Sequence, residues 1–417
     1  MRAINFFGRR PIIFLDSNRS FSAVGFCTVV KRTIIISNGA AGAENQCLGL
    51  VRALGLSHQQ TIYHVTRPTG GINKWLRWLP VSVHRRLNDI TNLTYSDLKA
   101  QMAFGSMVLP ISAAKKGYSS SLEADARMTF ETIRDGPVLV VASGRDTISV
   151  ASSLKRLAPE SVFLVQIQHP RSRMNRFDLV ITPRHDYYGL TAQGQKEIAW
   201  FLRWLITPSK PERHVVLTIG ALHRFDSTTL AVASSAWHDE LASLSKPLLV
   251  VNIGGPTGNC EYGTELANEL VSSLKKVIWS CGSIRISFSR RTPKKVSDIV
   301  MQELGDNLKV QIWNGKDSNP HLGNLAWADA FLITADSISM LSEACSTGKP
   351  VYVIGSELCK WKFSEFHRSL KERGAVRTFT GREDISNVWR YPPLNDTAEA
   401  ANRVVEALAE RGLVLHP

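Results

Sequence analysis

One stretch of the chain combines side chains that could hold a phosphate-bearing ligand. Residues 325–355 read LAWADAFLITADSISMLSEACSTGKPVYVIG, which predicts a strand, a small polar loop, a helix and a second strand. A helix that begins just beyond a parallel strand directs free N–H groups into the crevice at the sheet edge. On this functional interpretation, the cleft contains Asp336, Ser337, Ser339 and Glu343. The alternative, which this stretch alone favours, is an ordinary βαβ unit whose helix is capped by Asp336 or Ser337 and binds no ligand.

Other turns between a strand and a helix extend the same expectation. Gly254 and Gly255, in IGGPTGN, could let backbone amides approach a diphosphate, and Arg290 adds positive charge to the same edge. The remaining candidates for the cleft lie on two turns in the first half of the chain: Gly39, Gly42, Glu44, Asn45, Ser143, Gly144, Arg145 and Asp146. None of these turns completes a G-x-G-x-x-G motif or a P-loop, so the sequence argues against a dinucleotide site.

Two histidines are candidates for proton transfer. His169 and His185 lie in the basic segment 168–190, which we expect at the end of a strand and therefore in the cleft. His185 adjoins Asp186, and a histidine–carboxylate pair can act as a general base. The arginines of the segment could instead clamp an anion. This signal alone favours a structured basic loop in which the adjacent His and Asp face different sides.

Several chemistries have no support in the sequence. No D-x-D, H-E-x-x-H or G-x-S-x-G motif is present, so nothing indicates a metal-dependent enzyme or a serine hydrolase. The six cysteines include no C-x-x-C pair, and their scattered apolar surroundings fit a reducing compartment such as the cytosol. We expect neither a metal nor a cofactor.

The bulk composition indicates a globular protein with anionic partners. The chain has 417 residues, 44% of them hydrophobic and 21% charged, and this length suits two domains. A formal net charge of +14 favours phosphorylated ligands, acidic lipid headgroups, acidic protein surfaces or nucleic acid, without choosing among them. No run approaches the ~20 apolar residues that span a bilayer, so we expect any membrane association to be peripheral.

Basic residues concentrate in two N-terminal regions. Residues 1–32 form a basic tail with a single acidic residue, which fits either an organelle-targeting leader or a poorly ordered terminus. No acidic residue lies between Glu44 and Asp89, and segment 70–87 interleaves tryptophans with Lys and Arg. That pattern suits lipid headgroups or an acidic groove on a partner. A buried helical hairpin with solvated arginines is the alternative, which the pattern slightly favours.

The order of predicted elements divides the folded part of the chain. Alternating strands and helices predict a Rossmann-like domain over 33–207, a connecting strand, helix and hinge over 208–246, and a second Rossmann-like domain over 247–395. Such a pair resembles the GT-B architecture of nucleotide-sugar glycosyltransferases, an α/β fold of two Rossmann-like domains facing across a cleft. The resemblance implies that the last helix, within 396–417, returns toward the first domain.

A closer resemblance covers nearly the whole chain from about Thr33. The blocks that carry it are NGAAGAENQCLGLVRALGL, VTRPTGGINKWLRWLPVS, SGRDTIS, VQIQHPRSRMNRFDLVITPRHDYY, HVVLTIGALH, KPLLVVNIGGP, ISFSRRTPKKVS, TADSISMLSEACSTGKPVYV and YPPLNDTAEAA. Together they resemble the plant mitochondrial fission family Elongated Mitochondria. The resemblance implies action at the cytosolic face of the outer mitochondrial membrane, where members help to recruit a dynamin-related GTPase. Residues 1–32 and 91–116 depart from the family pattern, so the resemblance does not imply how the chain is targeted to that membrane.

Two hypotheses from different classes follow. The favoured one is a non-catalytic division factor that binds the outer mitochondrial membrane peripherally, through acidic lipids or a resident protein. Its expected partner is a dynamin-related GTPase, and no nucleic acid is expected. The competing hypothesis is a metal-independent glycosyltransferase that uses a nucleotide-sugar donor. In that case Asp336, Ser337, Ser339 and Glu343 hold the donor, and Gly254 and Gly255 approach its phosphates. His169 or His185 is the candidate base.

Overall fold

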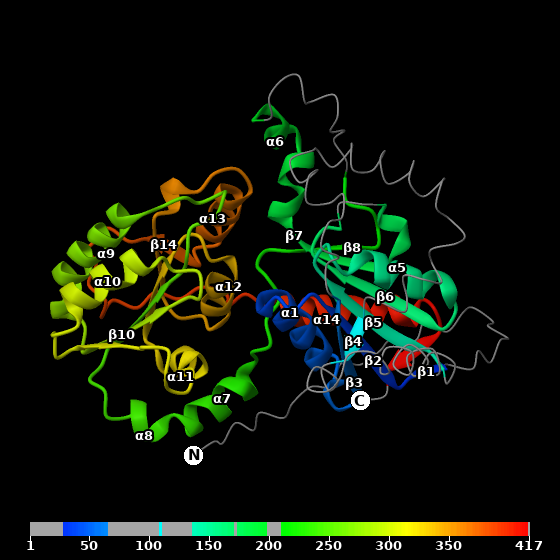
Figure 1. The fold of residues 1–417 in the computed structure, drawn as a ribbon, viewed down its shortest axis with the longest axis horizontal. Coiled ribbons are helices and arrows are strands. Elements are labelled where there is room, and N and C mark those ends of the chain that lie inside the picture. The colour runs from blue at the N-terminus through cyan, green and yellow to red at the C-terminus, as the bar shows by residue number, and fades with distance from the viewer. Residues whose placement is uncertain (1–27, 66–107, 111–135, 171–172, 198–209, 416–417) are drawn as a thin grey trace, which may run out of the picture.

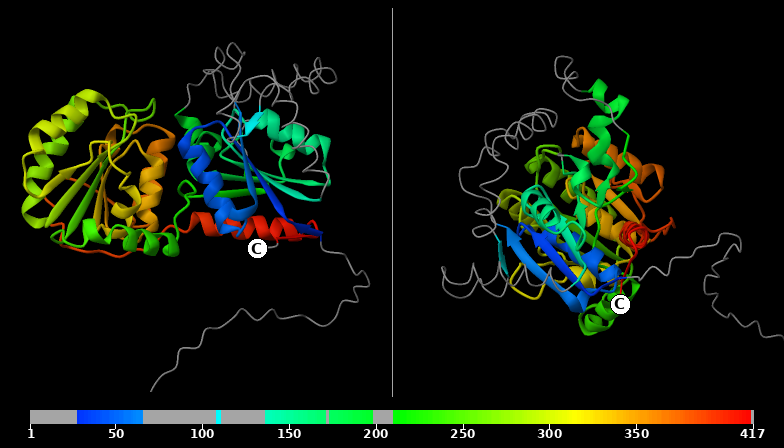
Figure 2. Two further views of the ribbon diagram at one scale, coloured as in Figure 1. Left: turned by 60° about the horizontal axis from the view of Figure 1, so that its bottom comes forward. Right: turned by 90° about the vertical axis from the view of Figure 1, so that its right-hand side faces the viewer.

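One mainly parallel sheet and one wholly parallel sheet, each covered by helices, lie side by side in the computed structural model (Figures 1 and 2). The structure describes residues 28–65, 108–110, 136–170, 173–197 and 210–415. The basic tail up to residue 27, the tryptophan-rich segment 70–87 and most of 91–116 lie outside the described residues. The α/β fold class with two Rossmann-like domains is confirmed.

The first sheet has seven strands in the order β4-β3-β2-β5-β6-β7-β8, of which only β4 is antiparallel to its neighbour. Its strands are β2 (Arg32–Ser37), β3 (Gln60–Val65), β4 (Val108–Pro110), β5 (Val138–Ser143), β6 (Val162–Ile167), β7 (Leu179–Pro183) and β8 (Val215–Thr218). Runs of Val, Ile and Leu fill both faces, as buried parallel strands require. Helices α1 (Ala41–Ala53) and α5 (Ile148–Leu157) follow β2 and β5.

The second sheet is wholly parallel, in the order β11-β10-β9-β12-β13-β14. Its strands are β9 (Leu248–Ile253), β10 (Ser283–Phe288), β11 (Val310–Ile312), β12 (Ala330–Thr334), β13 (Val351–Ile354) and β14 (Val376–Thr378). This is the doubly wound order 3-2-1-4-5-6 of dinucleotide-binding folds. Helices α9 (Thr264–Val277) and α10 (Lys294–Leu304) pack on one face, and α11 (His321–Trp327), α12 (Ile338–Ser346) and α13 (Lys362–Glu372) on the other.

The two domains are joined at a polar junction behind the sheets. The last long helix, α14 (Asp396–Ala409), runs under the first domain and packs against α1 (Figure 2). Its buried Asp396 accepts hydrogen bonds from the backbone N–H groups of Ile219 and Gly220 at 2.9 and 2.8 Å. Beside them, Ala221 N–H donates to Ser342 Oγ on α12 at 2.9 Å. The loop after β8 is therefore held by both domains. A short pair, β1 (Thr28–Val30) and β15 (Leu413–Leu415), closes the chain.

A second contact joins the domains at η5 (Arg184–Leu190) and α13. Lys362 Nζ lies 2.9 Å from Asp186 Oδ1, and both side chains are largely buried. The His185 ring packs edge-on against Phe366, with centroids 5.4 Å apart. Two separated contacts therefore hold the relative position of the domains.

Several predicted boundaries were wrong. The single connecting helix expected within 208–246 is two helices, α7 (Ser227–Ala236) and α8 (His238–Leu241), because the chain bends at Trp237. The first helix begins at Ala41, so Gly42, Glu44 and Asn45 lie on that helix rather than in the turn before it. Ser337 is the N-cap residue of α12, but neither it nor Asp336 caps that helix with a side-chain hydrogen bond. The carboxylate of Asp336 is committed elsewhere, as described next.

Candidate functional site

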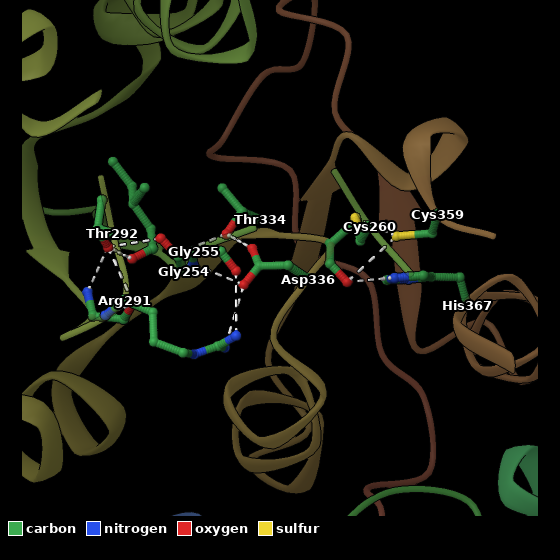
Figure 3. A network of polar contacts seen from close by, with 12 residues as sticks. Gly254, Gly255, Cys260, Arg291, Thr292, Thr334, Asp336, Cys359 and His367 are labelled. Carbon is green, nitrogen blue, oxygen red and sulfur yellow. Dashed lines mark hydrogen bonds and ion pairs between the residues drawn. The ribbon is translucent and has the colours of Figure 1, made fainter. Parts of the chain in front are cut away.

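Asp336 lies at the point where the strand order of the second sheet reverses, between β9 and β12. Its carboxylate accepts hydrogen bonds from Gly255 N–H at 2.9 Å and Thr334 Oγ at 2.7 Å, and Arg291 Nη2 lies 3.5 Å away (Figure 3). The Gly254 N–H donates to Thr334 Oγ at 2.7 Å. The Asp336 side chain is fully buried. The carboxylate therefore links the ADS turn (Ala335–Ser337) to the glycine-rich turn at Gly254 and Gly255, which the sequence predicted in the same cleft.

Burial governs the electrostatics of this carboxylate. Desolvation raises the pKa of Asp336, and the Thr334, Gly255, Arg291 and Tyr262 groups around it oppose that rise. Glycine is required at residue 254 because a Cβ there would lie 2.1 Å from Asp336 Oδ2. At this turn the backbone N–H groups of Gly254 and Gly255 are therefore hydrogen-bonded within the protein and are not free to bind a ligand.

Two buried thiols and a histidine support the same turn from behind. His367 Nε2 contacts the Ala335 carbonyl at 2.8 Å, and Cys359 Sγ approaches the same oxygen at 3.7 Å (Figure 3). Cys260 Sγ and Cys359 Sγ are in contact. Burial lowers the pKa of His367 to about 4, so this ring is neutral at physiological pH. The sequence offered no motif for this support, since its residues lie far apart along the chain.

Glu343, predicted for the cleft, is paired inside the second domain. His321 Nε2 on α11 lies 2.7 Å from Glu343 Oε2. Although burial opposes it, the Glu343 carboxylate raises the pKa of His321. This pair fixes α11 against α12. His321 was not predicted as a site residue. It begins α11, the helix that directly precedes β12, and a histidine at that place in the chain was the available signal.

The corresponding edge of the first sheet carries a second polar cluster. Glu44 Oε2 accepts from Ser37 Oγ at 3.1 Å and lies 2.9 Å from His64 Nε2. Asn38 Nδ2 donates to Asp146 Oδ2 at 3.1 Å and so bridges β2 and β5, where this sheet also reverses its order. Ser37, Asn38 and His64 were not predicted as site residues. Ser37 is the last residue of β2, Asn38 directly follows it, and His64 lies on the neighbouring strand β3.

The structure brings the two glycine-rich edges close together. A Cβ on Gly42, in the first turn of α1, would lie 4.0 Å from Ser339 Oγ in the first turn of α12. The N-termini of one helix from each domain therefore approach one another. Gly39, at φ +75°, makes the turn before α1. Gly144 has φ +87°, and a Cβ added to it would lie 3.6 Å from Asn38 Nδ2.

The other predicted residues occupy different settings. Asn45 lies on α1 and is partly buried, Ser143 is buried at the end of β5, and Arg145 lies in the turn that follows. Arg290 is exposed after β10, whereas the neighbouring Arg291 reaches the Asp336 network.

Both candidate bases are buried. His185 is 4% exposed, and burial lowers its pKa to about 4. His169 packs against the Tyr187 ring with centroids 4.9 Å apart. Each ring therefore contributes to packing at the edge of the first domain, and His185 also contributes to the contact with α13.

Within the described part of the chain, no group of three or more His, Cys, Asp or Glu residues could hold a metal ion. Among the same residues, no helix has the length and apolar character needed to cross a membrane.

Comparison with known proteins decides the family. The family model for mitochondrial fission ELM1 matches residues 41–408. The chain belongs to the mitochondrial fission ELM1 family. An Arabidopsis thaliana relative, the mitochondrial fission protein ELM1, is 56% identical over 97% of this chain and 99% of its own length. An uncharacterized protein of Rickettsia prowazekii is 32% identical over 65% of this chain and 80% of its own. ELM1 membership supports a role in mitochondrial fission and an association with mitochondria.

Solved structures resemble the ELM1-family chain only distantly. UDP-GlcNAc 2-epimerase from Methanocaldococcus jannaschii is 16% identical, with a TM-score of 0.49, over 91% of this chain and all of that one. MurG from Acinetobacter baumannii is 14% identical, with a TM-score of 0.38, over 91% of each chain.

Proposed function

We propose that this protein acts at the cytosolic face of the outer mitochondrial membrane and helps to recruit a dynamin-related GTPase to division sites. Membership of the mitochondrial fission ELM1 family is the observation that carries the proposal. The protein is a peripheral, non-catalytic factor that presents a docking surface on two Rossmann-like domains.

The geometry of the second domain supports a scaffold role. At the strand-order reversal, where doubly wound folds bind ligands, the Gly255 N–H donates to the buried Asp336 carboxylate. A donor that is already paired within the protein must exchange that bond for one to a ligand, and an anion would meet the carboxylate there. The residues of the crevice therefore favour rigidity over ligand capture.

Co-precipitation tests the recruitment step directly. The full tagged chain, expressed in plant cells and recovered under mild conditions, is expected to bring down a dynamin-related GTPase. The same chain carrying Asp239→Ala, at a fully exposed carboxylate, is a control for non-specific charge effects. Failure to recover any dynamin-related GTPase from cells in which the chain is on mitochondria would contradict the proposal.

Membrane association is proposed to be electrostatic. The net charge of +14 favours an acidic surface, whether of lipids or of a resident protein. Because exposed charges are screened within about 8 Å at physiological ionic strength, pelleting with mitochondria should fall steeply as salt is added. Full retention in high salt would show that another force holds the protein.

A second candidate function rests on the facing edges of the two domains. The helix N-termini that carry Gly42 and Ser339 face one another, and the Glu44–His64 pair lies on the same side of the first domain as Gly42, which suits the nucleotide-sugar donor of a metal-independent glycosyltransferase. A thermal-shift titration with a panel of nucleotide sugars tests it. A saturable rise in Tm with one donor, lost in the Ser339→Ala variant, would favour the enzyme, and no rise would exclude donor binding.

A further inference from the structure

One face of the second sheet is polar where helices cover it. On β10, Arg285 and Ser287 alternate with Ile284 and Ile286, and the isoleucines join the core beneath α9 and α10. Arg285 pairs in register with Gln311 on β11, so both side chains project from the opposite face. Parallel sheets between helices are normally apolar on both faces, and the polar residues here therefore call for a partner.

Arg285 is a buried charge whose Nη2 is paired and whose Nη1 is not. Its exposed fraction is 6%, and its Nη2 donates to Glu240 Oε1 on α8 at 2.7 Å. Within the described part of the chain, Arg285 Nη1, Trp313 Nε1 and Ser287 Oγ are buried without hydrogen-bond partners. A buried polar group without a hydrogen-bond partner destabilises the fold, and a charged one does so more strongly. Arg285 lies on β10 and Trp313 directly follows β11, and a ligand that brings oxygen atoms would satisfy their unpaired N–H groups.

A cavity of ≈ 230 Å³ adjoins two of these groups, those of Arg285 and Trp313, and its lining also includes Trp237, Glu240 and Asp317. The Trp237 ring is held against the backbone of α11, because a Cβ on Gly323 would lie 2.5 Å from it. Sites for drug-sized ligands span roughly 300–1,000 Å³. This cavity therefore has room for one small ring and excludes a whole nucleotide sugar.

The charges of the lining select against an anion. Glu240 offsets the charge of Arg285, and Asp317 adds a further negative charge. An anionic ligand would be repelled by that carboxylate. Neutral hydroxyl groups, in contrast, can accept hydrogen bonds from the arginine and the indole and donate to the carboxylates. The two tryptophans supply flat apolar surface, which matches the C–H face of a sugar ring.

We propose that this cavity binds a single pyranose ring, either as a free monosaccharide or as the terminal unit of a glycan. The cavity is separate from the edges that carry Asp336 and Glu44. Trp237 and Glu240 belong to the connection between the domains, whereas Arg285 and Trp313 belong to the second sheet and the loop after it. Because Glu240 on α8 contacts Arg285 on β10, a sugar bound beside this pair would tie that connection to the sheet.

Titration of the full chain with glucose, galactose, mannose and N-acetylglucosamine tests the proposal, with tryptophan fluorescence and saturation-transfer NMR as the readouts. At least one sugar is expected to bind saturably, while the open-chain polyol sorbitol and sodium sulfate are not. The methyl glycosides of the binding sugar distinguish its source. A site for glycan ends accepts one methyl anomer, and a site for free sugar rejects both.

Substitutions locate the binding. Trp313→Phe removes the indole N–H and keeps an aromatic ring, and Arg285→Lys keeps the charge and removes the planar donors. Each should weaken binding by about tenfold. Trp279→Phe is the matched control, since that side chain is 67% exposed and lies outside the cavity, and it should leave affinity unchanged. Should Arg285→Lys fail to fold, which circular dichroism would reveal, Trp313→Phe decides alone.

Four results would overturn the proposal. They are the absence of saturable binding by any of the four sugars, saturable binding of sulfate, an affinity that Trp313→Phe does not change, and a high-resolution structure grown in the presence of the sugars in which only ordered water contacts Arg285 Nη1.

Discussion

At the scale of single residues, Asp336 explains why its turn looks like a ligand site yet is filled from within. Its two carboxylate oxygens receive Gly255 N–H and Thr334 Oγ, and the side chain is fully buried. The same small and polar residues that would bind a phosphate here bind each other. Sequence spacing cannot distinguish these two outcomes, because both require short side chains around a helix N-terminus.

Removing this carboxylate should therefore destabilise the fold. Asp336→Ala leaves two donors unpaired in a buried site, so we expect the free energy of unfolding to fall by about 2–4 kcal/mol in urea titrations. Asp239→Ala, at a fully exposed carboxylate, should change it by less than about 0.5 kcal/mol. Equal stability of the two variants would mean that Asp336 does not hold the glycine-rich turn.

The buried histidines predict how stability depends on pH. Burial lowers the pKa of His185 to about 4, whereas a histidine in the unfolded chain titrates near 6.5. Between these values the unfolded chain takes up a proton that the folded chain does not, so stability is complete above pH 6.5 and falls as the pH drops toward 4. At pH 5 the loss from this residue is about 2 kcal/mol.

The variant His185→Gln isolates this contribution. Between pH 7 and pH 5 the free energy of unfolding should fall in both proteins, and the fall should be about 2 kcal/mol smaller in the variant than in the wild type. His238→Gln makes the same change at a 65% exposed ring and is the matched control. If His185→Gln keeps the wild-type pH dependence, the His185 ring is not titrating out of a buried state.

At the scale of elements, the strands were easier to predict than the helix ends. Runs such as TIIIS, VLVVA and AFLIT are continuous apolar segments of strand length, and each is a strand between helices. The break of the connecting helix at Trp237 was missed because tertiary packing of that ring on Gly323 causes it, and no local signal marks it.

The candidate site was predicted only in part, for a similar reason. The glycine-rich and ADS turns were found because strand ends and small residues are local features. Their partners, such as His321 for Glu343 and His64 for Glu44, lie about 20 residues away, and only the fold pairs them. The Glu343 and Glu44 carboxylates, which made each turn resemble a binding site, are therefore already paired within the protein.

Helix α14 gives a prediction at this scale. Asp396 receives the N–H groups of Ile219 and Gly220, so Asp396→Ala should lower the unfolding free energy by about 2–4 kcal/mol and speed hydrogen exchange at those amides. Asp298→Ala, which removes an exposed carboxylate paired with exposed Lys294, is the matched control. Unchanged exchange at residues 219 and 220 would show that α14 does not hold the loop.

At the scale of the whole molecule, two contacts position one domain against the other. The Lys362–Asp186 pair sits at the contact of η5 with α13, opposite the junction built around Asp396. Lys362→Glu places like charges at about the same separation, and should weaken this contact by about 1–3 kcal/mol.

Small-angle X-ray scattering checks this prediction, since separation of the domains at one contact raises the radius of gyration. Lys360→Glu makes the same charge change at an exposed neighbouring residue and should not alter the scattering. Identical curves for the two variants would indicate that the Asp186 contact does not set the domain arrangement.

The central claim is that this molecule promotes mitochondrial division by bringing a dynamin-related GTPase to the organelle. The most direct test is to count GTPase foci per mitochondrion, and to measure mitochondrial length, in plant cells that lack the protein and in the same cells after the full chain is restored. The account predicts fewer foci and longer mitochondria without the protein, with both reversed on restoration. Unchanged numbers of foci on mitochondria of normal length would contradict it.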